Sequence, residues 1–272
     1  LVFIVSGVAF KLGAAPFHMW LPDVYHGAPT AIAVFIGSAA KVAAFGLLYR
    51  LLEGGLGPMS EHWTPMLALL SVLSLAVGNL FAIAQSNLKR MLAYSTISHI
   101  GFMLLGFVGG SPAGYSAAMF YIISYTMTAT VAFGIIALLA RAGFECEEID
   151  DFKGLNQRSP WYAAIMGISM FSLAGVPPLF GFFAKLLVLK SAIDAGFLWL
   201  AIVAIIFAII GIYYYLRVVK VMYFDAAADD AAVPLPADLP LRWVISLNGL
   251  ALVVLGLAWG PLFDWCNRAF GV

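Results

Sequence analysis

Long runs of apolar residues, separated by short polar stretches, make up most of the chain. A helix needs about 20 apolar residues to cross the ~30 Å hydrocarbon core of a bilayer. On this measure the pattern predicts eight crossings, at residues 1–20, 28–50, 63–84, 88–109, 113–141, 160–191, 195–224 and 241–260. Most of the connections are short, which favours a single transmembrane domain over residues 1–272. The sequence therefore predicts an all-α integral membrane protein, a polytopic helix bundle.

Two of the predicted crossings contain proline at positions that a continuous helix does not tolerate. Proline lacks an N–H and clashes with the carbonyl four residues earlier. Pro16 is expected to break the first crossing, and Pro177 with Pro178 the sixth. The carbonyls that lose their helical partners belong to Leu12, Leu173 and Ala174. Because irregular backbone at membrane depth is tolerated only against protein or a wet cavity, we expect two discontinuous helices beside water, a pattern typical of inverted-repeat transporters.

The polar stretches favour loops and give no indication of a cofactor. Residues 16–30 are rich in proline and polar side chains and are predicted not to be helical. The stretch 145–151 is interpreted as a solvated acidic turn and 225–240 as a flexible acidic linker. Net charge is zero and no basic block occurs, so nucleic acid is not indicated as a partner. No metal-binding pattern, phosphate loop or ligand set for flavin or haem is visible, which predicts no cofactor and no metal in this chain.

Basic residues are distributed unequally between the two predicted sides of the membrane. Eight of the 14 follow the third, fifth and seventh crossings, and three lie on the opposite side: Arg50, Lys190 and the tail residue Arg268. The positive-inside rule places the larger set inside. Its members are Lys89, Arg90, Arg141, Lys153, Arg158, Arg217, Lys220 and Arg242.

The three remaining basic residues, Lys11, Lys41 and Lys185, lie within predicted crossings, where no acidic residue occurs. Lys41 follows Pro29 by twelve residues, about 18 Å along a helix, which places it close to the midplane. Its ammonium cannot easily reach the interface from there. Because an apolar medium disfavours the charged form, a lysine at this depth can take up and release a proton, so these lysines are candidates for a proton relay.

Hydroxyl groups accompany a histidine in the fourth and fifth predicted crossings. His99 lies near the middle of the fourth, one turn after Ser95 and Thr96. Either a structural hydrogen bond to a hydroxyl or a role in a proton relay accounts for it. The fifth crossing carries hydroxyls at helical spacing on one face, and such a stripe joins helices more often than it lines a file of water. These residues are Tyr121, Ser124, Tyr125 and Thr128.

Four motifs carry a likeness to a known family. They are F-K-L-G-A-A-P-F-H-M-W-L-P-D-V-Y-H-G-A-P-T at 10–30, S-A-A-K-V-A-A-F-G at 38–46, Q-S-N-L-K-R-M-L-A-Y-S-T-I-S-H-I-G at 85–101 and G-V-P-P-L-F-G-F-F-A-K at 175–185. In this order they resemble the antiporter-like membrane subunits of respiratory complex I, the proton-translocating NADH:quinone oxidoreductase. The N type is the most similar, because P-D-V-Y-H-G-A-P and the lysine at position 185 argue against the related M type.

The resemblance implies a fold of 14 helices with two inverted five-helix repeats. This chain is then expected to hold the last eight helices, as the C-terminal part of a longer subunit. Residues 1–50 would end the first repeat, 63–224 would form the second, and 241–260 the final helix. By motif, Lys11, Lys41 and Lys185 match the proton-relay lysines of the family. A glutamate that pairs with the lysine matching Lys11 would lie in an earlier helix.

The resemblance also implies a function. The chain would relay protons across the membrane, coupled to electron transfer from NADH to quinone in other subunits, where NAD, FMN, iron–sulfur clusters and quinone are expected. Its partners would be other membrane subunits of complex I, the lipid bilayer, protons and water. The expected location is multi-pass in the bacterial cell inner membrane or the mitochondrial inner membrane. Two alternatives stay open: a subunit of a multisubunit sodium/proton antiporter, and a passive scaffold whose lysines pair across subunits.

Overall fold

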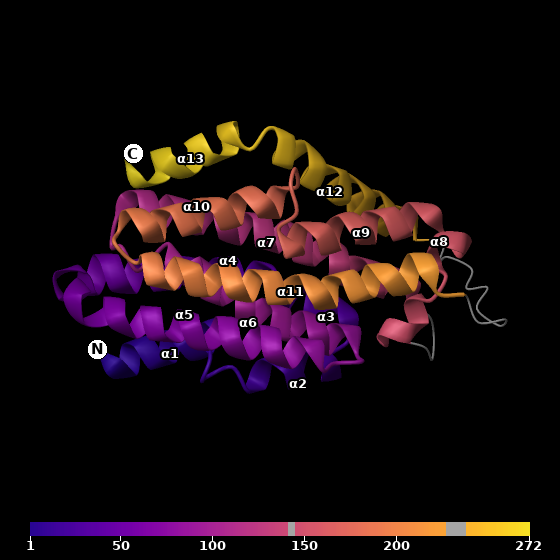
Figure 1. The fold of residues 1–272 in the computed structure, drawn as a ribbon, viewed down its shortest axis with the longest axis horizontal. Coiled ribbons are helices and arrows are strands. Elements are labelled where there is room, and N and C mark those ends of the chain that lie inside the picture. The colour runs from indigo at the N-terminus through magenta and orange to yellow at the C-terminus, as the bar shows by residue number, and fades with distance from the viewer. Residues whose placement is uncertain (141–144, 227–237) are drawn as a thin grey trace.

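The computed structural model describes residues 1–140, 145–226 and 238–272. Within these residues the chain is a bundle of helices without a β-strand (Figure 1). The α-helices are α1 (Val2–Leu12), α2 (Trp20–Gly27), α3 (Thr30–Gly37), α4 (Ala39–Tyr49), α5 (Ser60–Ile83), α6 (Leu88–Leu105), α7 (Pro112–Leu139), α8 (Leu155–Arg158), α9 (Pro160–Ala174), α10 (Phe180–Asp194), α11 (Leu198–Phe224), α12 (Leu239–Leu257) and α13 (Gly260–Phe270). A π-helix, Arg50–Gly55, continues α4, and short 3₁₀ helices occur at Gly57–Met59 and Ile149–Phe152.

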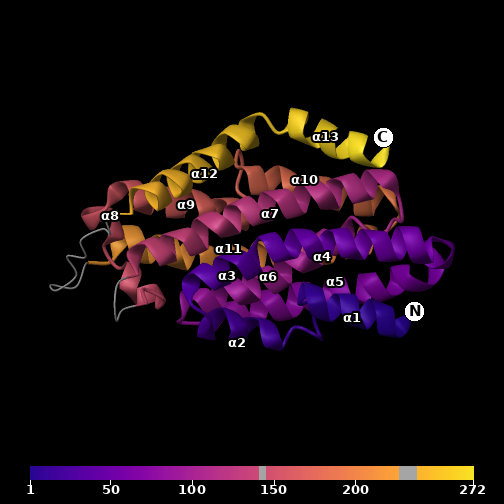
Figure 2. The ribbon, with the colours of Figure 1, turned by 180° about the vertical axis from the view of Figure 1, so that it is seen from behind.

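The helices run mostly along the longest axis of the molecule, and α7 lies inside the bundle (Figures 1 and 2). The pair α9 and α10 lies end to end along this axis, and α12 with α13 covers one side of the bundle. Close packing of α5 against α6 depends on small residues. A side chain at Gly78 would clash with the backbone of Ser98, and one at Gly101 would lie 2.9 Å from the carbonyl oxygen of Ser71. Small residues at helix contacts are typical of membrane bundles, in which van der Waals packing replaces the hydrophobic effect.

Five helices in the described part of the chain are long and apolar enough to cross a membrane. They are Thr30–Gly55, Gly57–Ile83, Pro112–Leu139, Leu198–Phe224 and Leu239–Leu257. Two shorter apolar helices, Val2–Leu12 and Pro160–Ala174, accompany them. The predicted all-α, polytopic membrane fold is therefore confirmed, whereas the count of eight crossings stays a prediction.

Helices end close to both sets of predicted breaks. The residue after α1 is Gly13, with φ 82°, and the residue after α9 is Gly175, with φ 84°. Glycine adopts this left-handed conformation without the strain that a Cβ causes, and it commonly ends helices. A proline follows a cis peptide bond three residues after each glycine, at Pro16 and Pro178. The helix therefore ends at the glycine, a few residues before the proline in the sequence.

One expectation near the start of the chain needs correction. Residues 16–30 are not free of helix, because α2 spans Trp20–Gly27. Its proline, Pro22, lies in the first turn, where no intrahelical N–H is required. The helix is interrupted locally at Ser38, between α3 and α4, within the span Thr30–Gly55 that overlaps the predicted crossing 28–50. The tail residue Arg268 lies in the last turn of α13.

The acidic stretch 145–151 is packed against the start of α6 and is not only a solvated turn. The Leu88 amide donates to the Glu147 carbonyl at 2.6 Å, and the Ile149 amide donates to the Ser86 carbonyl at 2.9 Å. The ammonium of Lys89 lies 2.9 Å from a carboxylate oxygen of Glu147. The first N–H groups of a helix have no partner within it, and this segment supplies one. Of the predicted acidic linker, residues 227–237 lie outside the described residues.

Several basic residues were predicted to lie on the inner side of the membrane. The segments that carry most of them meet at one end of the bundle, on the right in Figure 1. We call this the basic end and define it by residues 85–90, 145–158 and 217–226. Hydrogen bonds join these segments: Gly154 donates its amide to the carbonyl of Val221, and Arg217 donates to the carbonyl of Gln85. Arg141, which was assigned to the same side, lies outside the described residues.

Candidate functional site

Lys185 occupies the second turn of α10, close to the end of α9. Its side chain is buried, and its Nζ donates to the carbonyls of Leu173 and Ala174, each at 2.9 Å. These are the carbonyls that the sequence predicts to be left without helical partners. The ammonium also lies 5.0 Å from the centre of the Phe102 ring, within the range of a cation–π interaction. Lys185 therefore caps the C-terminus of α9, where a positive charge is favoured.

Lys41 does the same for α1. It lies at the start of α4 and is 1% exposed, and its Nζ donates to the Leu12 carbonyl at 2.8 Å. The Trp20 ring lies 5.2 Å from the ammonium. The carbonyl that was expected to be freed near Pro16 is thus bound by a lysine of another helix.

Neither buried lysine has a carboxylate partner among the described residues. The ion pairs in this part of the chain involve other side chains, such as Lys89 with Glu147 and Arg90 with Asp23. The charge on Lys41 and Lys185 is therefore balanced only by carbonyl dipoles and aromatic rings. A buried charge without a counter-charge is costly, so both lysines are suited to exchange a proton when their surroundings change.

Lys11 lies in the last turn of α1 and is exposed within this chain. It is close enough to Lys41 for the two charges to repel each other. It does not bind the carbonyls at the break, which Lys41 does instead. Adding a positive charge at Lys11 therefore disfavours a positive charge at Lys41.

His99 is bound on both sides by tyrosine hydroxyls. Its Nδ1 lies 2.7 Å from the Tyr121 hydroxyl of α7, and its Nε2 lies 3.1 Å from the Tyr215 hydroxyl of α11. The nearby hydroxyls of its own helix bond to tyrosines: Ser95 to Tyr215, and Thr96 to Tyr125. The sequence suggested hydroxyl partners for His99 in the preceding turn of α6. In the structure the hydroxyl partners of His99 come from neighbouring helices instead.

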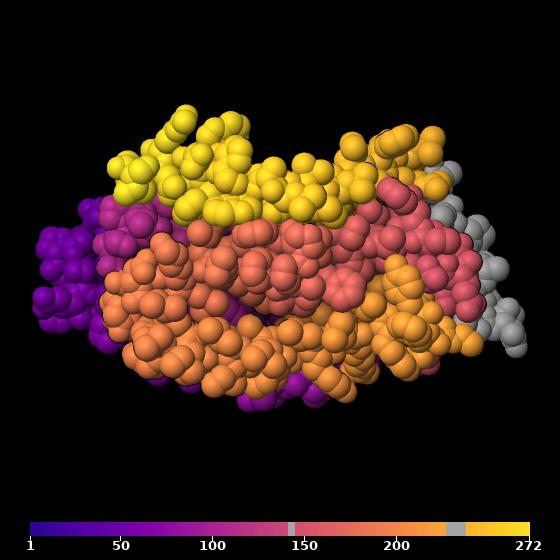
Figure 3. All heavy atoms as spheres, turned by 45° about the horizontal axis from the view of Figure 1, so that its top comes forward, coloured from indigo at the N-terminus to yellow at the C-terminus, as the bar shows by residue number. Residues whose placement is uncertain are grey.

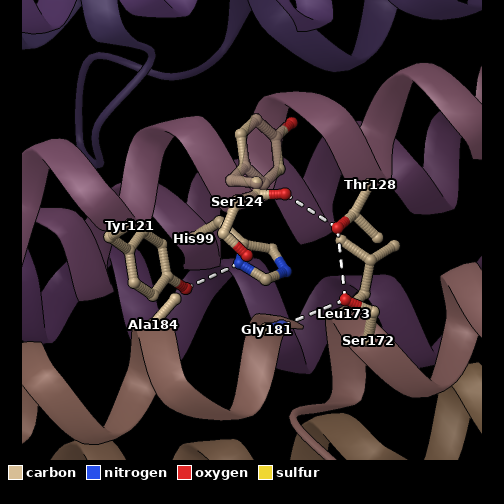
Figure 4. Close-up of a pocket in the computed structure, with 9 residues that line it drawn as sticks. His99, Tyr121, Ser124, Thr128, Ser172, Leu173, Gly181 and Ala184 are labelled. Carbon is tan, nitrogen blue, oxygen red and sulfur yellow. Dashed lines mark hydrogen bonds between the residues drawn. The ribbon is translucent and has the colours of Figure 1, made fainter. Parts of the chain in front are cut away.

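A small cavity adjoins His99 (Figure 4). It has about 10 Å³ of space for the centre of a water molecule, which is close to what one buried water needs. The hydroxyl stripe of α7 forms one wall, and the start of α10 and end of α9 form the other. The lining residues are His99, Tyr121, Ser124, Tyr125, Thr128, Ser172, Leu173, Gly181 and Ala184.

The predicted hydroxyl face of α7 both joins helices and borders the cavity. Thr128 Oγ1 lies 3.2 Å from Ser172 Oγ, which in turn accepts the Gly181 amide at 3.1 Å. Figure 4 shows this chain of contacts on one side of the cavity and the His99–Tyr121 contact on the other. Both interpretations of the stripe therefore describe part of what these side chains do.

Some contacts of the site are missed by the sequence analysis. Tyr215, Trp20 and Phe102 are apolar or aromatic in type and follow no motif that marks them as partners of His99 or the lysines. A signal does exist for Tyr215, because three successive tyrosines in an otherwise apolar helix cannot all face lipid. Among the described residues no group of three or more His, Cys, Asp or Glu side chains is placed to hold a metal ion.

Comparison with known proteins gives the same family as the motifs. A protein called NADH-quinone oxidoreductase subunit N, from Xanthomonas euvesicatoria pv. vesicatoria (strain 85-10), is 61% identical over 271 residues, which are 99% of this chain and 55% of that protein. A chain of respiratory complex I from Thermus thermophilus matches with a TM-score of 0.82 and 32% identity, over 95% of this chain and 56% of that chain. A chain of the Mrp complex from Dietzia sp. DQ12-45-1b matches with a TM-score of 0.84 at 21% identity, over 97% of this chain and 57% of that one, a likeness that shows the fold alone.

The chain spans about half the length of the curated relatives it matches. These relatives are bacterial, and together with the apolar helices they confirm the predicted multi-pass location in a bacterial inner membrane. The predicted resemblance to the antiporter-like subunits of complex I is likewise confirmed. A family model described as NADH:quinone oxidoreductase/Mrp antiporter, transmembrane, matches residues 1–211, so the chain belongs to this family.

Proposed function

We propose that this chain is part of a proton-translocating membrane subunit of NADH:quinone oxidoreductase. It relays protons through buried lysines while electrons pass from NADH to quinone in other subunits. The observation that carries the proposal is the pair Lys41 and Lys185. Each is buried without a carboxylate and binds carbonyls at the end of a helix beside a break. Relatives named subunit N at 55–61% identity support it.

Electrostatic repulsion supplies the driving force in this mechanism. Lys11 exchanges charge with a glutamate of an earlier helix, and loss of that counter-charge raises the repulsion that Lys41 feels. Lys41 then releases its proton along the bundle, and Lys185 passes a proton toward the far side. Lys185 binds the carbonyl of Leu173, and Leu173 and His99 line the same cavity. His99 serves as a further relay between the tyrosine hydroxyls and the cavity.

The two breaks fit a fold with two discontinuous transmembrane helices. In this interpretation α1 with α2, and α9 with α10, each form one crossing, and the chain holds about eight of 14 crossings. Residues 1–50 end the first inverted repeat, 63–224 form the second, and 241–260 belong to the final helix. The same arrangement of a left-handed glycine, a freed carbonyl and a buried lysine occurs at both breaks, which supports the repeat.

The proposal assigns no cofactor or metal to this chain. NAD, FMN, iron–sulfur clusters and quinone belong to partner subunits, and the other membrane subunits of the complex are the partners. Both α11 and the C-terminal helices lie at the surface of the molecule, in orange and yellow in Figure 3. Exposed apolar side chains on α11 and α12, such as Ile209 and Val254, suit contact with lipid or with these subunits.

Replacement of Lys41 tests the proposal. We expect Lys41→Met in the assembled enzyme to reduce both quinone reduction and NADH-driven proton pumping sharply, because methionine has similar bulk and cannot carry a proton. Lys220→Met is the control, since the side chain of Lys220 is 63% exposed at the basic end. Near-normal pumping by Lys41→Met would remove Lys41 from the proton path.

Two other functions make different predictions. A sodium/proton antiporter, favoured by the second half of the family description, would show sodium-dependent transport in vesicles without NADH. A passive scaffold would lose stability when its lysines are replaced, with no change in the ratio of protons to electrons.

A further inference from the structure

Tyr215 is not among the relay residues predicted from the sequence, yet its hydroxyl joins two polar groups of the site. It is 2% exposed, and its hydroxyl bonds to both Ser95 Oγ and His99 Nε2. It lies on α11, a helix whose other faces are largely apolar and exposed. A buried hydroxyl held between a serine and a histidine can both receive and donate a proton.

Further polar groups lie beside Tyr215. The ring of Tyr214 lies beside it, with centroids 4.3 Å apart, and the Tyr214 hydroxyl donates to Asn79 Oδ1 at 3.1 Å. Asn79 also donates to Ser98 Oγ at 2.8 Å. Two residues after Tyr215 on α11, the guanidinium of Arg217 donates to the Gln85 carbonyl at 3.0 Å and is only half-buried. The remaining distance to the surface is short, because Tyr215 precedes the end of α11 at Phe224 by nine residues, about 14 Å of helix.

We propose that Tyr215 is a further proton-relay residue and that, with Ser95, it delivers protons from the basic end to His99. This inference rests on the proposed function and adds an uptake branch to it. The hydroxyls of Ser95 and Tyr215 form the branch, and His99 joins it to Tyr121 and to the cavity, which is lined by Leu173, the residue whose carbonyl accepts from Lys185.

The transfer leaves no charge on the branch. Ser95 passes its hydroxyl proton to the Tyr215 oxygen as it receives one from the side of Tyr214. Tyr215 passes its own hydroxyl proton to His99 Nε2, and His99 gives up the proton on Nδ1 to the Tyr121 oxygen. Tyr121 releases its proton to water in the cavity and thence to the amine of Lys185. Each group gains one proton and loses one, and rotation of the hydroxyls and the imidazole ring restores the starting state.

The neighbouring Tyr213 provides a matched control on the same helix. It is 60% exposed, so its hydroxyl faces away from this site. Tyr215→Phe and Tyr213→Phe each remove one oxygen and keep the ring. A packing role for Tyr215 predicts that the two variants behave alike, because the packed ring is unchanged. A relay role predicts a difference that depends on the hydroxyl alone.

The test is made in the full-length chain within the assembled membrane complex. Proton pumping driven by NADH is followed in inverted membrane vesicles, and quinone reduction is measured in parallel, in H₂O and D₂O. We expect Tyr215→Phe to lower the pumping rate about tenfold, as loss of a positioned proton-transfer group does, and to change its solvent isotope effect. Tyr213→Phe should match the wild type in both. Equal pumping and equal isotope effects for the two variants would overturn the inference.

Two further variants keep the test decisive. Ser95→Ala removes the other hydroxyl of the branch and is expected to reproduce the slower pumping, whereas Tyr215→His, which restores a group able to carry protons, should recover part of the rate. Tyr215→Phe could reduce the amount of assembled complex on native gels. In that case Ser95→Ala is compared with Tyr213→Phe, and equal pumping rates of these two variants refute the branch.

Lys185→Ala tests the proposed function separately. Normal pumping by Lys185→Ala refutes the relay itself. Loss of pumping in Lys185→Ala together with normal pumping in Tyr215→Phe refutes only the branch.

Discussion

The two breaks differ in where the buried lysine comes from. The first break lies between α1 and α2, and its lysine belongs to neither of these helices. Lys41 belongs to α4 and binds a single carbonyl, that of Leu12, at the end of α1. At the second break, Lys185 belongs to α10, the helix that directly follows, and binds the carbonyls of Leu173 and Ala174 at the end of α9. Loss of the proton from Lys41 therefore weakens a contact between two helix pairs, whereas its loss from Lys185 weakens a contact within one.

Backbone amides near the two breaks show the same difference. The amide of Ala15 donates at 2.9 Å to Ser74 of α5, a helix outside the first pair. The amide of Gly181 donates at 3.1 Å to Ser172 of α9, within the second pair. These amide contacts tie the first break to a neighbouring helix and the second to its own helix pair, and the second break also adjoins the cavity with His99. We infer that the first is suited to transmit a change of charge between helices and the second to exchange protons with water.

Lys185→Ala should have the largest effect, because it removes the proton carrier and leaves two carbonyls without a donor. We expect NADH-driven proton pumping to fall by more than about tenfold. Lys190→Ala on the same helix is the control, since the Lys190 side chain is 72% exposed. If both variants pump equally, the second break does not exchange protons and the contrast between the breaks fails.

Gly256→Val tests whether α12 holds the second break in place. Any side chain at this position would collide with the carbonyl of Pro178 and with Leu179 and Phe180. Overpacking of a buried contact costs roughly 1–3 kcal/mol, so the variant should unfold at lower temperature in detergent and pump less. A Gly46→Val variant in α4, where nothing lies within 4 Å of an added Cβ, serves as the control. A melting temperature for Gly256→Val equal to that of the control would show that α12 does not hold the break.

Ser74→Ala tests the connection of the first break to α5. It removes the acceptor of the Ala15 amide, which lies in the interior of the bundle. An unsatisfied buried donor costs about 1–3 kcal/mol, so we expect a lower thermal stability and a reduced pumping rate. Ser6→Ala on α1, where the serine is half-buried, is the matched control. Equal stability of the two variants would show that the first break does not depend on α5.

The positions of the helices and breaks were largely predictable from sequence, because proline, glycine and apolar runs act locally. The chemistry of Pro16, Pro177 and Pro178 identified the freed carbonyls of Leu12, Leu173 and Ala174, and the structure shows lysines on all three. The partner of Leu12 could not be predicted. Lys41 follows it by 29 residues, and only the packing of α4 against α1 brings the two together.

The expectations for residues 20–27 and for the acidic stretch 145–151 were wrong for the same physical reason. Residues 20–27 contain proline and charged groups, yet they form α2 because Pro22 occupies the first turn and Tyr25 is fully buried. The acidic turn was expected to be solvated because its charges are close together in sequence. Glu147 instead meets Lys89 of α6 across the fold. Composition predicts the average surroundings of a segment, whereas these contacts depend on which other segments reach it.

The smallest effect is expected where the first break meets the basic end. Asp23 of α2 lies 2.7 Å from the guanidinium of Arg90 of α6, but its side chain is 71% exposed. Exposed ion pairs contribute about 0–1 kcal/mol and are weakened by salt, so Asp23→Asn should change thermal stability by no more than about 0.5 kcal/mol. Lys89 lies next to Arg90 in the sequence and is 2% exposed, and its Nζ binds the Ala28 carbonyl as well as Glu147. Lys89→Met should therefore destabilise the protein more than Asp23→Asn, because it leaves a buried carbonyl and a carboxylate without their donor. If the order is reversed, the exposed pair and not the buried lysine holds α2 against α6, and the first break is anchored at the membrane surface.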